Sequence, residues 1–215
     1  MNLPACVYHL AEAANWASIQ RYGLLSARNL VEFAGLRGAA CERVETQHRP
    51  ERTVLPNGVV VRDQKPMSPA ALERCLVGMT PGQWYALLNT KVFFWFDTER
   101  LNRQRRACGA YPQISLIIDT KKLLERYADA AAVTPINTGN ARRRPTLRAS
   151  ETFVPYPMWL KSAWSSEAQA LGTRTRPRNH PPVELAVADS VPDVLDFVLD
   201  VRHLAPGDCL MPYRP

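Results

Sequence analysis

The sequence predicts an α+β fold made of one domain. About six or seven short strands are expected, with helices between them in irregular order, whereas a doubly wound fold would alternate strand and helix regularly. The strongest strand signal is residues 91–96, Lys-Val-Phe-Phe-Trp-Phe, because aromatic and β-branched side chains favour strands. A chain of 215 residues with 46% hydrophobic residues can bury a core without disulfides or metal.

Several segments have the apolar, β-branched or aromatic composition of strands. In chain order they are residues 6–10, 59–61, 91–96, 114–118, 132–136, 150–154 and 184–187. The turn signal Asn57-Gly58 precedes the second of these segments and supports that prediction.

Capping residues, prolines and a glycine mark the expected helices. Ser26 can cap one helix, and Ser68-Pro69 and Thr80-Pro81 each place a proline at the first position of another. Further helices are expected at residues 12–22 (ended by Gly23), 98–107, 119–124 and 192–201. Residues 41–57 are expected to form a loop, and residues 165–182 a basic surface loop within the single domain 1–215.

The bulk composition favours a cytoplasmic protein with a polyanionic partner. The net charge of +7 suits nucleic acid or a dinucleotide, although clustered arginines are also common on solvated surfaces. Five widely spaced cysteines without a C-x-x-C pair predict reduced thiols. No apolar stretch approaches the roughly 20 residues of a membrane span, so no membrane partner is expected.

Several common sites lack support in the sequence. It contains no G-x-G-x-x-G or G-x-x-x-x-G-K-[ST] phosphate loop and no G-x-S-x-G elbow. Its four histidines form no H-E-x-x-H motif and have no partnering cysteine pair, so no metal is expected.

Two polar residues in apolar segments are the first candidates for chemistry. His9 lies at the end of the first expected strand, where a lone histidine can equally be a structural group. Glu151 lies in the expected strand 150–154, and a buried carboxylate needs either a partner or a task. The aromatic segment 92–96, taken alone, is a core strand.

Taken together and in order, these segments resemble the DarT-like ADP-ribosyltransferases, NAD-dependent bacterial toxins that modify bases in DNA. The matching elements are Tyr8-His9, Asn15, Gly23-Leu24-Leu25, the aromatic strand 92–96, the apolar strand and helix 114–124, Asn137-Thr138-Gly139-Asn140-Ala141, and Arg148-Ala149-Ser150-Glu151-Thr152-Phe153-Val154. The resemblance covers residues 7–155. The sequence departs from the family in lacking the Asp of its Thr-Asp-Gly element and in having Trp95 in place of a tyrosine.

The resemblance implies an ADP-ribosyltransferase-like fold with central split sheets, mixed or antiparallel, and flanking helices. It also implies NAD+ as substrate, no metal, Glu151 as the catalytic carboxylate and an arginine upstream of the aromatic strand. Arg62 is the first candidate for that arginine, and Arg49 and Arg52 compete with it. The implied NAD+-binding residues are His9, Asn15, Leu24, Leu25, Phe94 and Trp95. The implied nucleic-acid-binding residues are Asn140, Arg142, Arg143, Arg144 and Arg148.

These residue types suit the implied chemistry. ADP-ribosyl transfer breaks the nicotinamide–ribose bond, and a carboxylate can stabilise the developing positive charge or take a proton from the acceptor. An arginine suits a diphosphate because its planar fork matches phosphate oxygens. The acceptor can be DNA, RNA or an acidic protein, and an antitoxin partner is compatible with the resemblance. The alternatives are an inactive nucleotide- or nucleic-acid-binding module and an RNA 2′-phosphotransferase-like enzyme on the same scaffold.

Overall fold

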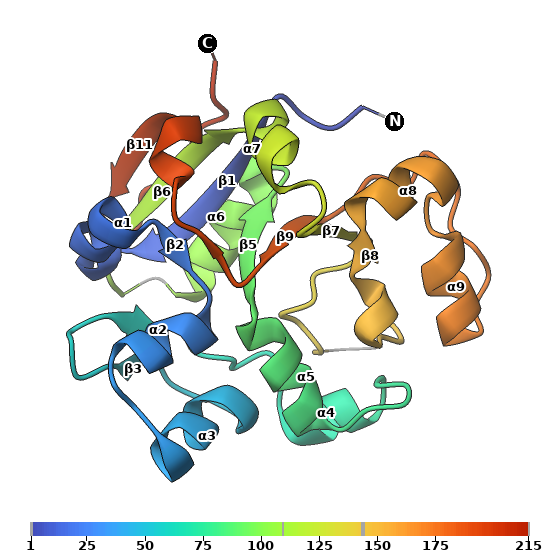
Figure 1. Ribbon diagram of the computed structural model, residues 1–215, viewed down its shortest axis with the longest axis horizontal. Helices are drawn as coiled ribbons and strands as arrows, with labels where there is room; N and C mark the ends of the chain where they lie inside the picture. Colours follow the sequence, from blue (N-terminus) through green and yellow to red (C-terminus); the bar gives the residue numbers. More distant parts are fainter. Residues whose placement is uncertain (1, 109, 143–144, 215) are drawn as a thin grey trace.

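The main sheet of the molecule is antiparallel throughout. The computed structural model describes residues 2–108, 110–142 and 145–214 (Figure 1). Within them the sheet has the strand order β11-β6-β1-β5-β9-β7-β8, and every neighbouring pair runs antiparallel. Its strands are β1 (Cys6–Glu12), β5 (Lys91–Trp95), β6 (Gln113–Asp119), β7 (Ala131–Thr134), β8 (Val154–Pro155), β9 (Glu184–Ala188) and β11 (Val198–Leu204). The predicted α+β class is confirmed, and the sheet is antiparallel rather than mixed.

The sheet is nearly divided between β1 and β5. Strand β1 pairs with β6 along its whole length, from Cys6↔Asp119 to Glu12↔Gln113. It meets β5 only at Tyr8↔Trp95. Beyond that pair the two strands separate, so the half β11-β6-β1 and the half β5-β9-β7-β8 share one short contact. Side chains of β1 that follow Tyr8 therefore lie where the two halves part.

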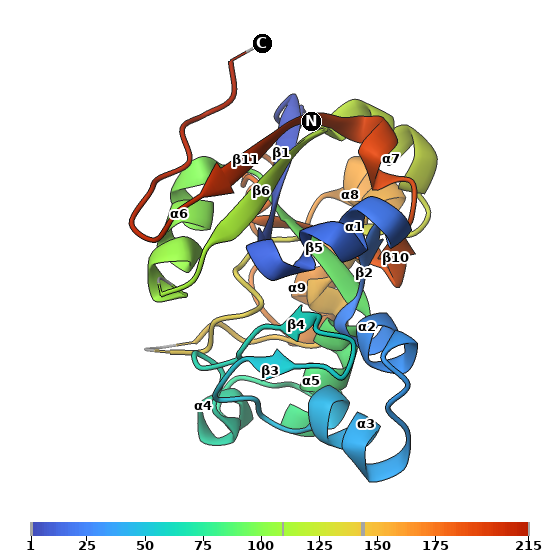
Figure 2. The same ribbon diagram turned by 90° about the vertical axis from the view of Figure 1, so that its left-hand side faces the viewer.

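Helices and two small ribbons surround the sheet (Figures 1 and 2). In Figure 1 the segment from α2 to α5 lies below the sheet, and α8 and α9 lie to its right. The helices are η1 (Ala13–Asn15), α1 (Trp16–Tyr22), α2 (Ala27–Phe33), α3 (Gly38–Thr46), α4 (Pro69–Glu73), α5 (Pro81–Asn89), α6 (Thr98–Ala107), α7 (Thr120–Tyr127), η2 (Ser150–Thr152), α8 (Tyr156–Ser162), α9 (Ser165–Leu171) and η3 (Val194–Phe197). The ribbons pair β2 (Leu24–Leu25) with β10 (Ser190–Val191), and β3 (Thr53–Val54) with β4 (Val60–Val61).

Successive side chains of each strand point to opposite faces of the sheet, and each face packs into its own core. One core contains Phe94 and Leu185 together with Trp159 of α8. On the other face, Tyr8 and Trp95 pack with Leu101 of α6, as residues opposite one another on neighbouring strands do. A smaller core between α2, α3 and the β3–β4 ribbon contains Val31, Val44, Leu55, Val59 and Val61.

Several helices begin where their capping residues predict. Thr80 forms a capping box with Gln83 ahead of Pro81, and the Ser26 Oγ accepts from the Asn29 amide. Gly23 ends α1 with φ of +71°, and a side chain there would clash with the backbone of Pro192. Glycine is therefore required on both counts.

Four expectations about local structure are wrong. Residues 41–57 are not all loop, since α3 covers 38–46. The expected strand 150–154 is the 3-10 helix η2 followed by the short β8. The expected surface loop 165–182 begins with the helix α9, whose buried Glu167 pairs with Arg176 at 3.2 Å. The expected helix 192–201 is instead η3 and then β11, because the edge of β6 pairs its backbone groups.

Two general expectations can also be compared with the structure. No helix in the described part of the chain is both long and apolar enough to cross a membrane. All five cysteines are free thiols.

Candidate functional site

Four polar side chains gather at the second half of β1. They are His9 and Glu12 of that strand, Arg62 just after β4, and Cys108 at the end of α6. The Arg62 Nε lies 3.6 Å from the Glu12 Oε1, and its Nη1 lies 4.0 Å from the Cys108 Sγ. The charge of Arg62 also acts on His9. Three segments far apart in the sequence thus meet where the sheet divides, and we call these four residues the His9 cluster.

His9 is held in one tautomer. Its Nδ1 lies 2.8 Å from the Phe93 backbone oxygen, which can only accept, so Nδ1 carries the hydrogen. Nε2 therefore keeps a free lone pair. Burial, followed by the charge of Arg62, lowers the pKa of His9 to about 4. His9 is consequently neutral at physiological pH, and its Nε2 can accept a hydrogen bond.

Arg62 has an unused donor. Its side chain is 20% exposed, yet the Nη2 atom is buried and has no hydrogen-bond partner among the described residues. A buried guanidinium nitrogen without an acceptor is costly, because it has lost water and gained nothing in exchange. The Nη2 group is therefore suited to an anionic or polar ligand. Phosphate oxygens fit this donor, whereas a metal cation would be repelled by it.

Glu12 is the carboxylate of the cluster, and sequence reasoning missed it. It is 4% exposed and neighbours Arg62. Its one sequence signal is an acidic residue closing the apolar run that contains His9. Nothing in the sequence around Cys108 marks it as a nucleophile. Burial raises the pKa of its thiol, so it stays protonated at neutral pH.

Asn15 holds the backbone of β4, the strand that precedes Arg62. Its side-chain amide donates to the Val60 oxygen at 2.9 Å and accepts from the Val60 nitrogen at 2.8 Å. Both functional atoms are thus committed to β4, two residues before Arg62. A direct NAD+ contact, as the resemblance implies for Asn15, would require breaking these bonds.

The other implied NAD+-binding residues are mostly structural. Phe94 and Leu24 lie in the main core, with exposures of 0% and 3%. Trp95 is buried, and its Nε1 donates to the Gln104 Oε1 at 2.7 Å. Leu25 is half-buried in the β2–β10 ribbon. The structure therefore corrects the sequence interpretation for Leu24, Phe94 and Trp95, since an apolar or satisfied side chain inside the core has no surface to offer a ligand.

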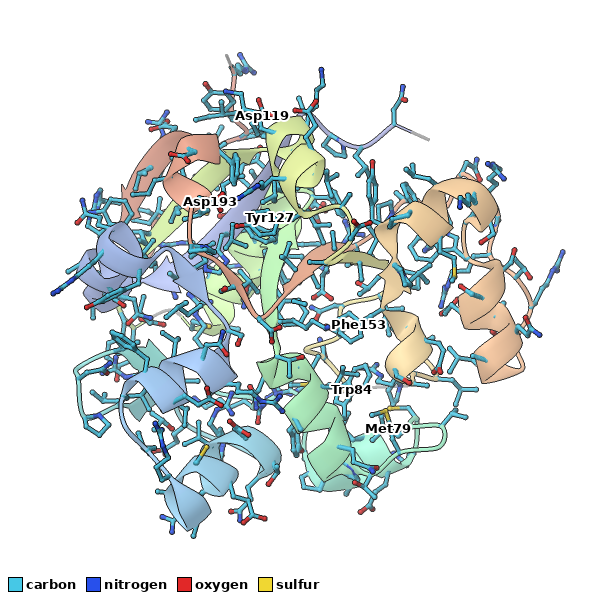
Figure 3. The ribbon with its side chains drawn as sticks, viewed as in Figure 1. Met79, Trp84, Asp119, Tyr127, Phe153 and Asp193 are labelled. Carbon is cyan, nitrogen blue, oxygen red and sulfur yellow. The ribbon has the colours of Figure 1, made fainter. Side chains whose placement is uncertain are left out.

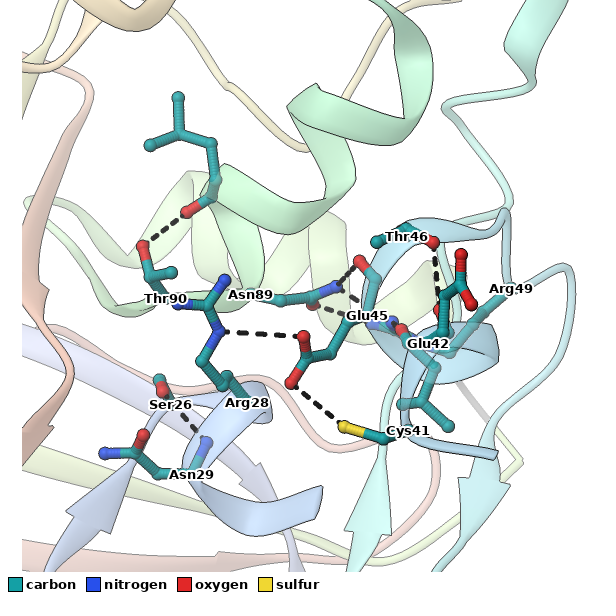
Figure 4. Close-up of polar contacts among 12 residues, drawn as sticks. Ser26, Arg28, Asn29, Cys41, Glu42, Glu45, Thr46, Arg49, Asn89 and Thr90 are labelled. Atoms are coloured by element: carbon teal, nitrogen blue, oxygen red, sulfur yellow. Dashed lines mark hydrogen bonds and ion pairs between the residues drawn. The ribbon is translucent and has the colours of Figure 1, made fainter. Parts of the chain in front are cut away.

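The arginines that compete with Arg62 have different surroundings. Arg49 is 8% exposed and donates to the Asn89 Oδ1 at 3.1 Å (Figure 4). It also donates to the Arg62 backbone oxygen at 3.2 Å. Burial lowers the pKa of Arg49 to about 10. Arg49 therefore holds the α3–α5 region and the backbone of Arg62 together. Arg52 is exposed and lies over the ring of Tyr111.

Glu151 lies outside the His9 cluster. It is exposed on η2, and its carboxylate has one hydrogen-bond partner among the described residues, the Ser150 hydroxyl at 2.9 Å. Two residues later, Phe153 lies near Trp84 (Figure 3), with 5.9 Å between the ring centroids. The centroid of the Phe93 ring is 6.1 Å from that of Phe153. Phe93 is the residue whose carbonyl holds His9. The segment of Glu151 thus reaches the cluster through Phe153 and Phe93 rather than through the carboxylate.

The segment before Glu151 is attached to the segment after Arg62. The Ala141 nitrogen donates to the Pro66 oxygen at 2.9 Å. The neighbouring Asn140 and Arg142 are exposed, and the Asn140 Oδ1 accepts from the Arg142 amide at 2.9 Å. Arg143 and Arg144 lie outside the described residues. Asn140 and Arg142 can therefore face an acceptor beside the Arg62 segment.

Arg148 is not on this surface. It is 2% exposed, and its guanidinium donates to the backbone oxygens of Thr138 and Thr146, both at 3.2 Å. It also lies 5.7 Å from the Trp84 ring. The sequence interpretation of Arg148 as a phosphate contact is thereby corrected, because a buried guanidinium bonded through Nε and Nη1 supports the loop instead.

A second buried carboxylate was also missed. Glu184 of β9 is 4% exposed, and its Oε2 lies near the Thr134 hydroxyl, the Thr138 amide and the Thr138 hydroxyl, at 3.1, 3.1 and 2.8 Å. Burial raises the pKa of Glu184 to about 7. Glu184 and Arg148 together fix Thr138 at the start of the segment that leads to Glu151.

A surface hollow lies apart from the His9 cluster. It has a volume of about 640 Å³ and lies between the N-terminal segment, α8 and residues 178–182, with Trp159, Arg100 and His180 among its lining residues. It is an open surface hollow, and the unpaired buried donor among its described lining residues, the Trp159 Nε1, belongs to an uncharged indole, whereas the unpaired donor of the cluster belongs to a guanidinium. The described residues contain no group of histidine, cysteine or acidic side chains that could hold a metal.

Comparison with known proteins gives one match. A family model described as a family of unknown function, DUF7002, matches residues 5–198. No curated protein and no solved structure matches the chain.

Proposed function

The chain belongs to the DUF7002 family, whose function is unknown, and from its site we propose that it is an NAD+-dependent ADP-ribosyltransferase acting on nucleic acid. The proposal includes an ADP-ribosyltransferase-like fold related to that of the DarT-like enzymes. It rests on the likeness of segments along residues 7–155 and on the His9 cluster.

The observation that carries the proposal is the meeting of His9 with Arg62. The resemblance names these two residues from separate segments. Arg62 lies beside Glu12 on the strand of the half-buried His9, and its charge helps to lower the pKa of His9. Arg62 brings a buried Nη2 without a protein partner, and His9 brings a free Nε2 lone pair. The Arg62 Nη2 can donate to an anion, and the neutral His9 Nε2 can accept a hydrogen bond. Together they suit a ligand that carries both phosphate and hydroxyl groups.

We assign roles to these groups within NAD+ binding. The Arg62 guanidinium binds diphosphate oxygens through Nη2, while Glu12 and Cys108 fix its other nitrogens. The His9 Nε2 accepts from a hydroxyl of the nicotinamide ribose. In this proposal the ligand binds beside β1, at the point where its backbone no longer pairs with β5.

Glu151 is the catalytic carboxylate in this proposal. Its exposure leaves it free to approach a bound substrate and to take a proton from the acceptor. The bond from Ala141 to Pro66 keeps its segment beside that of Arg62. Asn140 and Arg142 then contact the nucleic acid, with Arg142 neutralising a phosphate. Arg143 and Arg144, which share this segment, keep the same proposed role.

The test is transfer of label from NAD+. Purified protein is incubated with labelled NAD+ and, separately, with single-stranded DNA, duplex DNA, RNA or a protein lysate. We expect label on one nucleic acid, and we expect Glu151→Ala and Arg62→Lys to lose it while keeping the wild-type melting temperature. Arg62→Lys is informative because lysine keeps the charge but not the planar fork.

A matched pair separates the two carboxylates. Glu12→Gln removes the charge beside Arg62, and Glu151→Gln removes the exposed charge on η2. If Glu151→Gln transfers label as the wild type does and Glu12→Gln does not, the catalytic carboxylate is Glu12. If no variant or wild-type protein transfers label to any acceptor, the transferase proposal is rejected.

A binding module without turnover is the second candidate. The separation of Glu151 from the His9 cluster favours it, because the carboxylate is not yet placed beside the proposed ligand. NAD+ or oligonucleotide binding without cleavage of NAD+ would establish this candidate. Release of a 2′-phosphate from RNA in the same reactions would instead indicate a phosphotransferase.

A further inference from the structure

Two arginines stand opposite each other at the end of the β3–β4 ribbon. The register pairs Thr53 with Val61 and Val54 with Val60, so its continuation places Arg52 opposite Arg62. Both reach the turn between α6 and β6. The Arg62 Nη1 lies 4.0 Å from the Cys108 Sγ, and the Arg52 guanidinium lies 3.5 Å from the centre of the Tyr111 ring.

The turn that carries Tyr111 is attached to the His9 cluster. The Ala13 amide, next to Glu12, donates to the Pro112 oxygen at 3.0 Å. This bond fixes the backbone of Pro112, the residue after Tyr111, next to the His9 cluster. Tyr111 is nevertheless 42% exposed, and Arg52 is exposed as well. An aromatic ring and a guanidinium thus lie together at the surface, next to the proposed NAD+ site.

This pair has the chemistry of a nucleobase platform. Aromatic rings and arginine planes are the groups on which unpaired bases stack, and a guanidinium can also bind the adjoining phosphate. Arg52 adds positive charge to the ring face, which strengthens contact with an electron-rich base. Neither side chain is needed for a core, since both are exposed.

We propose that Tyr111 and Arg52 form a subsite that binds a nucleobase together with its adjoining phosphate, at the edge of the His9 cluster. This inference rests on the proposed function, because it assigns a part of the same site. Two sources can supply the ligand: the adenine end of NAD+ or an unpaired base of the acceptor strand. The subsite is distinct from Asn140 and Arg142, which belong to the segment before Glu151.

Binding measurements on the full chain test the subsite without requiring turnover. The probes are ADP-ribose, followed by calorimetry, and short labelled single strands of DNA and RNA of one sequence, followed by fluorescence anisotropy. We expect Tyr111→Ala to weaken one of these probes about tenfold or more, and Tyr111→Phe to bind almost as wild type. Arg52→Ala should weaken the same probe and reduce its salt dependence.

The matched control is Phe33→Ala, which removes another exposed aromatic ring, on α2. It should leave binding of every probe unchanged. If Tyr111→Ala and Arg52→Ala weaken the binding of ADP-ribose, the subsite belongs to NAD+. If they weaken the binding of an oligonucleotide, it belongs to the acceptor strand. The inference is overturned if Tyr111→Ala binds all probes as the wild type does, or if the wild type binds none of them.

Failure of the subsite is distinguishable from failure of the proposed function. Transfer of label that does not depend on Tyr111 or Arg52, with unchanged binding, removes the subsite and keeps the enzyme. Binding that depends on Tyr111, without any cleavage of NAD+, keeps the subsite and removes the enzyme.

Discussion

His9 and Glu184 are two interior groups that stay neutral when the protein is folded. For His9, burial and then the charge of Arg62 lower the pKa to about 4, and they outweigh the bond to the Phe93 carbonyl, which favours the protonated ring. For Glu184, burial raises the pKa to about 7. The bonds that the Thr138 amide and the Thr138 and Thr134 hydroxyls donate to its Oε2 favour the carboxylate, but burial outweighs them. The Thr134 hydroxyl contributes little because it also lies 2.8 Å from the Ile136 oxygen.

The pKa of Glu184 predicts a fall of stability with rising pH. Its pKa is raised from an ordinary value of 4.5 to about 7. Between these pH values the folded state keeps a proton that the unfolded state has released. The contribution of Glu184 to the free energy of unfolding therefore decreases from about pH 4.5 to about pH 7, by up to about 3 kcal/mol. Glu184→Gln imitates the neutral form, so in urea denaturation across this window its stability should gain on that of the wild type as pH rises. An unchanged pH dependence would contradict a protonated Glu184.

The pKa of His9 predicts the opposite trend. It is lowered from 6.5 to about 4, so the unfolded state binds the proton first as pH falls. The contribution of His9 to stability is full above about pH 6.5 and is lost as pH falls toward 4. The trends of His9 and Glu184 offset each other between about pH 4.5 and 6.5. His9→Gln should then unmask the Glu184 trend, so that the urea midpoint falls with rising pH. A midpoint that still matches the wild type at each pH would refute this account.

At the scale of single elements, the Asn15 side chain anchors the short β4 strand. Both bonds of the Asn15 amide go to Val60, and in the described residues β4 pairs with β3 alone. A two-residue strand has little stability of its own, so Asn15, together with Arg49 on the Arg62 oxygen, sets the position of Arg62. The sequence pattern placed Asn15 correctly after the first strand. It could not show which backbone Asn15 binds, because that partner is 45 residues away.

Removal of the Asn15 amide should therefore loosen the Arg62 segment. Asn15→Ala leaves the Val60 N–H and C=O without partners in a buried position, at a cost of about 2–4 kcal/mol. We expect a lower melting temperature and weaker ADP-ribose binding than in the wild type. The matched control is Asn29→Ala, which removes an exposed amide bonded to the Asp189 oxygen and should change both quantities little. Equal effects of the two changes would remove the special role of Asn15.

At the scale of the whole molecule, local sequence signals predicted the helices and strands better than they predicted which residues lie together in space. Strands β1, β5, β6, β7 and β9 and the capped helices α2, α5 and α6 follow from periodicity, aromatic runs and capping residues. The wrong elements were those decided by long-range pairing, such as β11 on the edge of β6. For the same reason the sequence indicated His9 and Arg62 but missed Glu12, Cys108 and Glu184. Which polar residues lie together depends on the order of strands in the sheet, which a single sequence does not reveal.

Two arginines of one basic segment illustrate the difference and give the last prediction. In sequence, Arg142 and Arg148 look alike, but Arg142 is exposed whereas Arg148 bonds two backbone oxygens inside the molecule. Arg148→Ala leaves both acceptors unpaired and opens a cavity against Trp84, so it should cost about 3 kcal/mol or more. Arg142→Ala should change stability by less than about 0.5 kcal/mol. It should lower the slope of log affinity against log salt for a single-stranded oligonucleotide by about 1, because one phosphate contact is lost. Thermal denaturation and salt titration of the two variants measure these effects. An unchanged slope in Arg142→Ala would mean that this segment does not contact the nucleic acid, and the acceptor would then have to approach from the side of Tyr111.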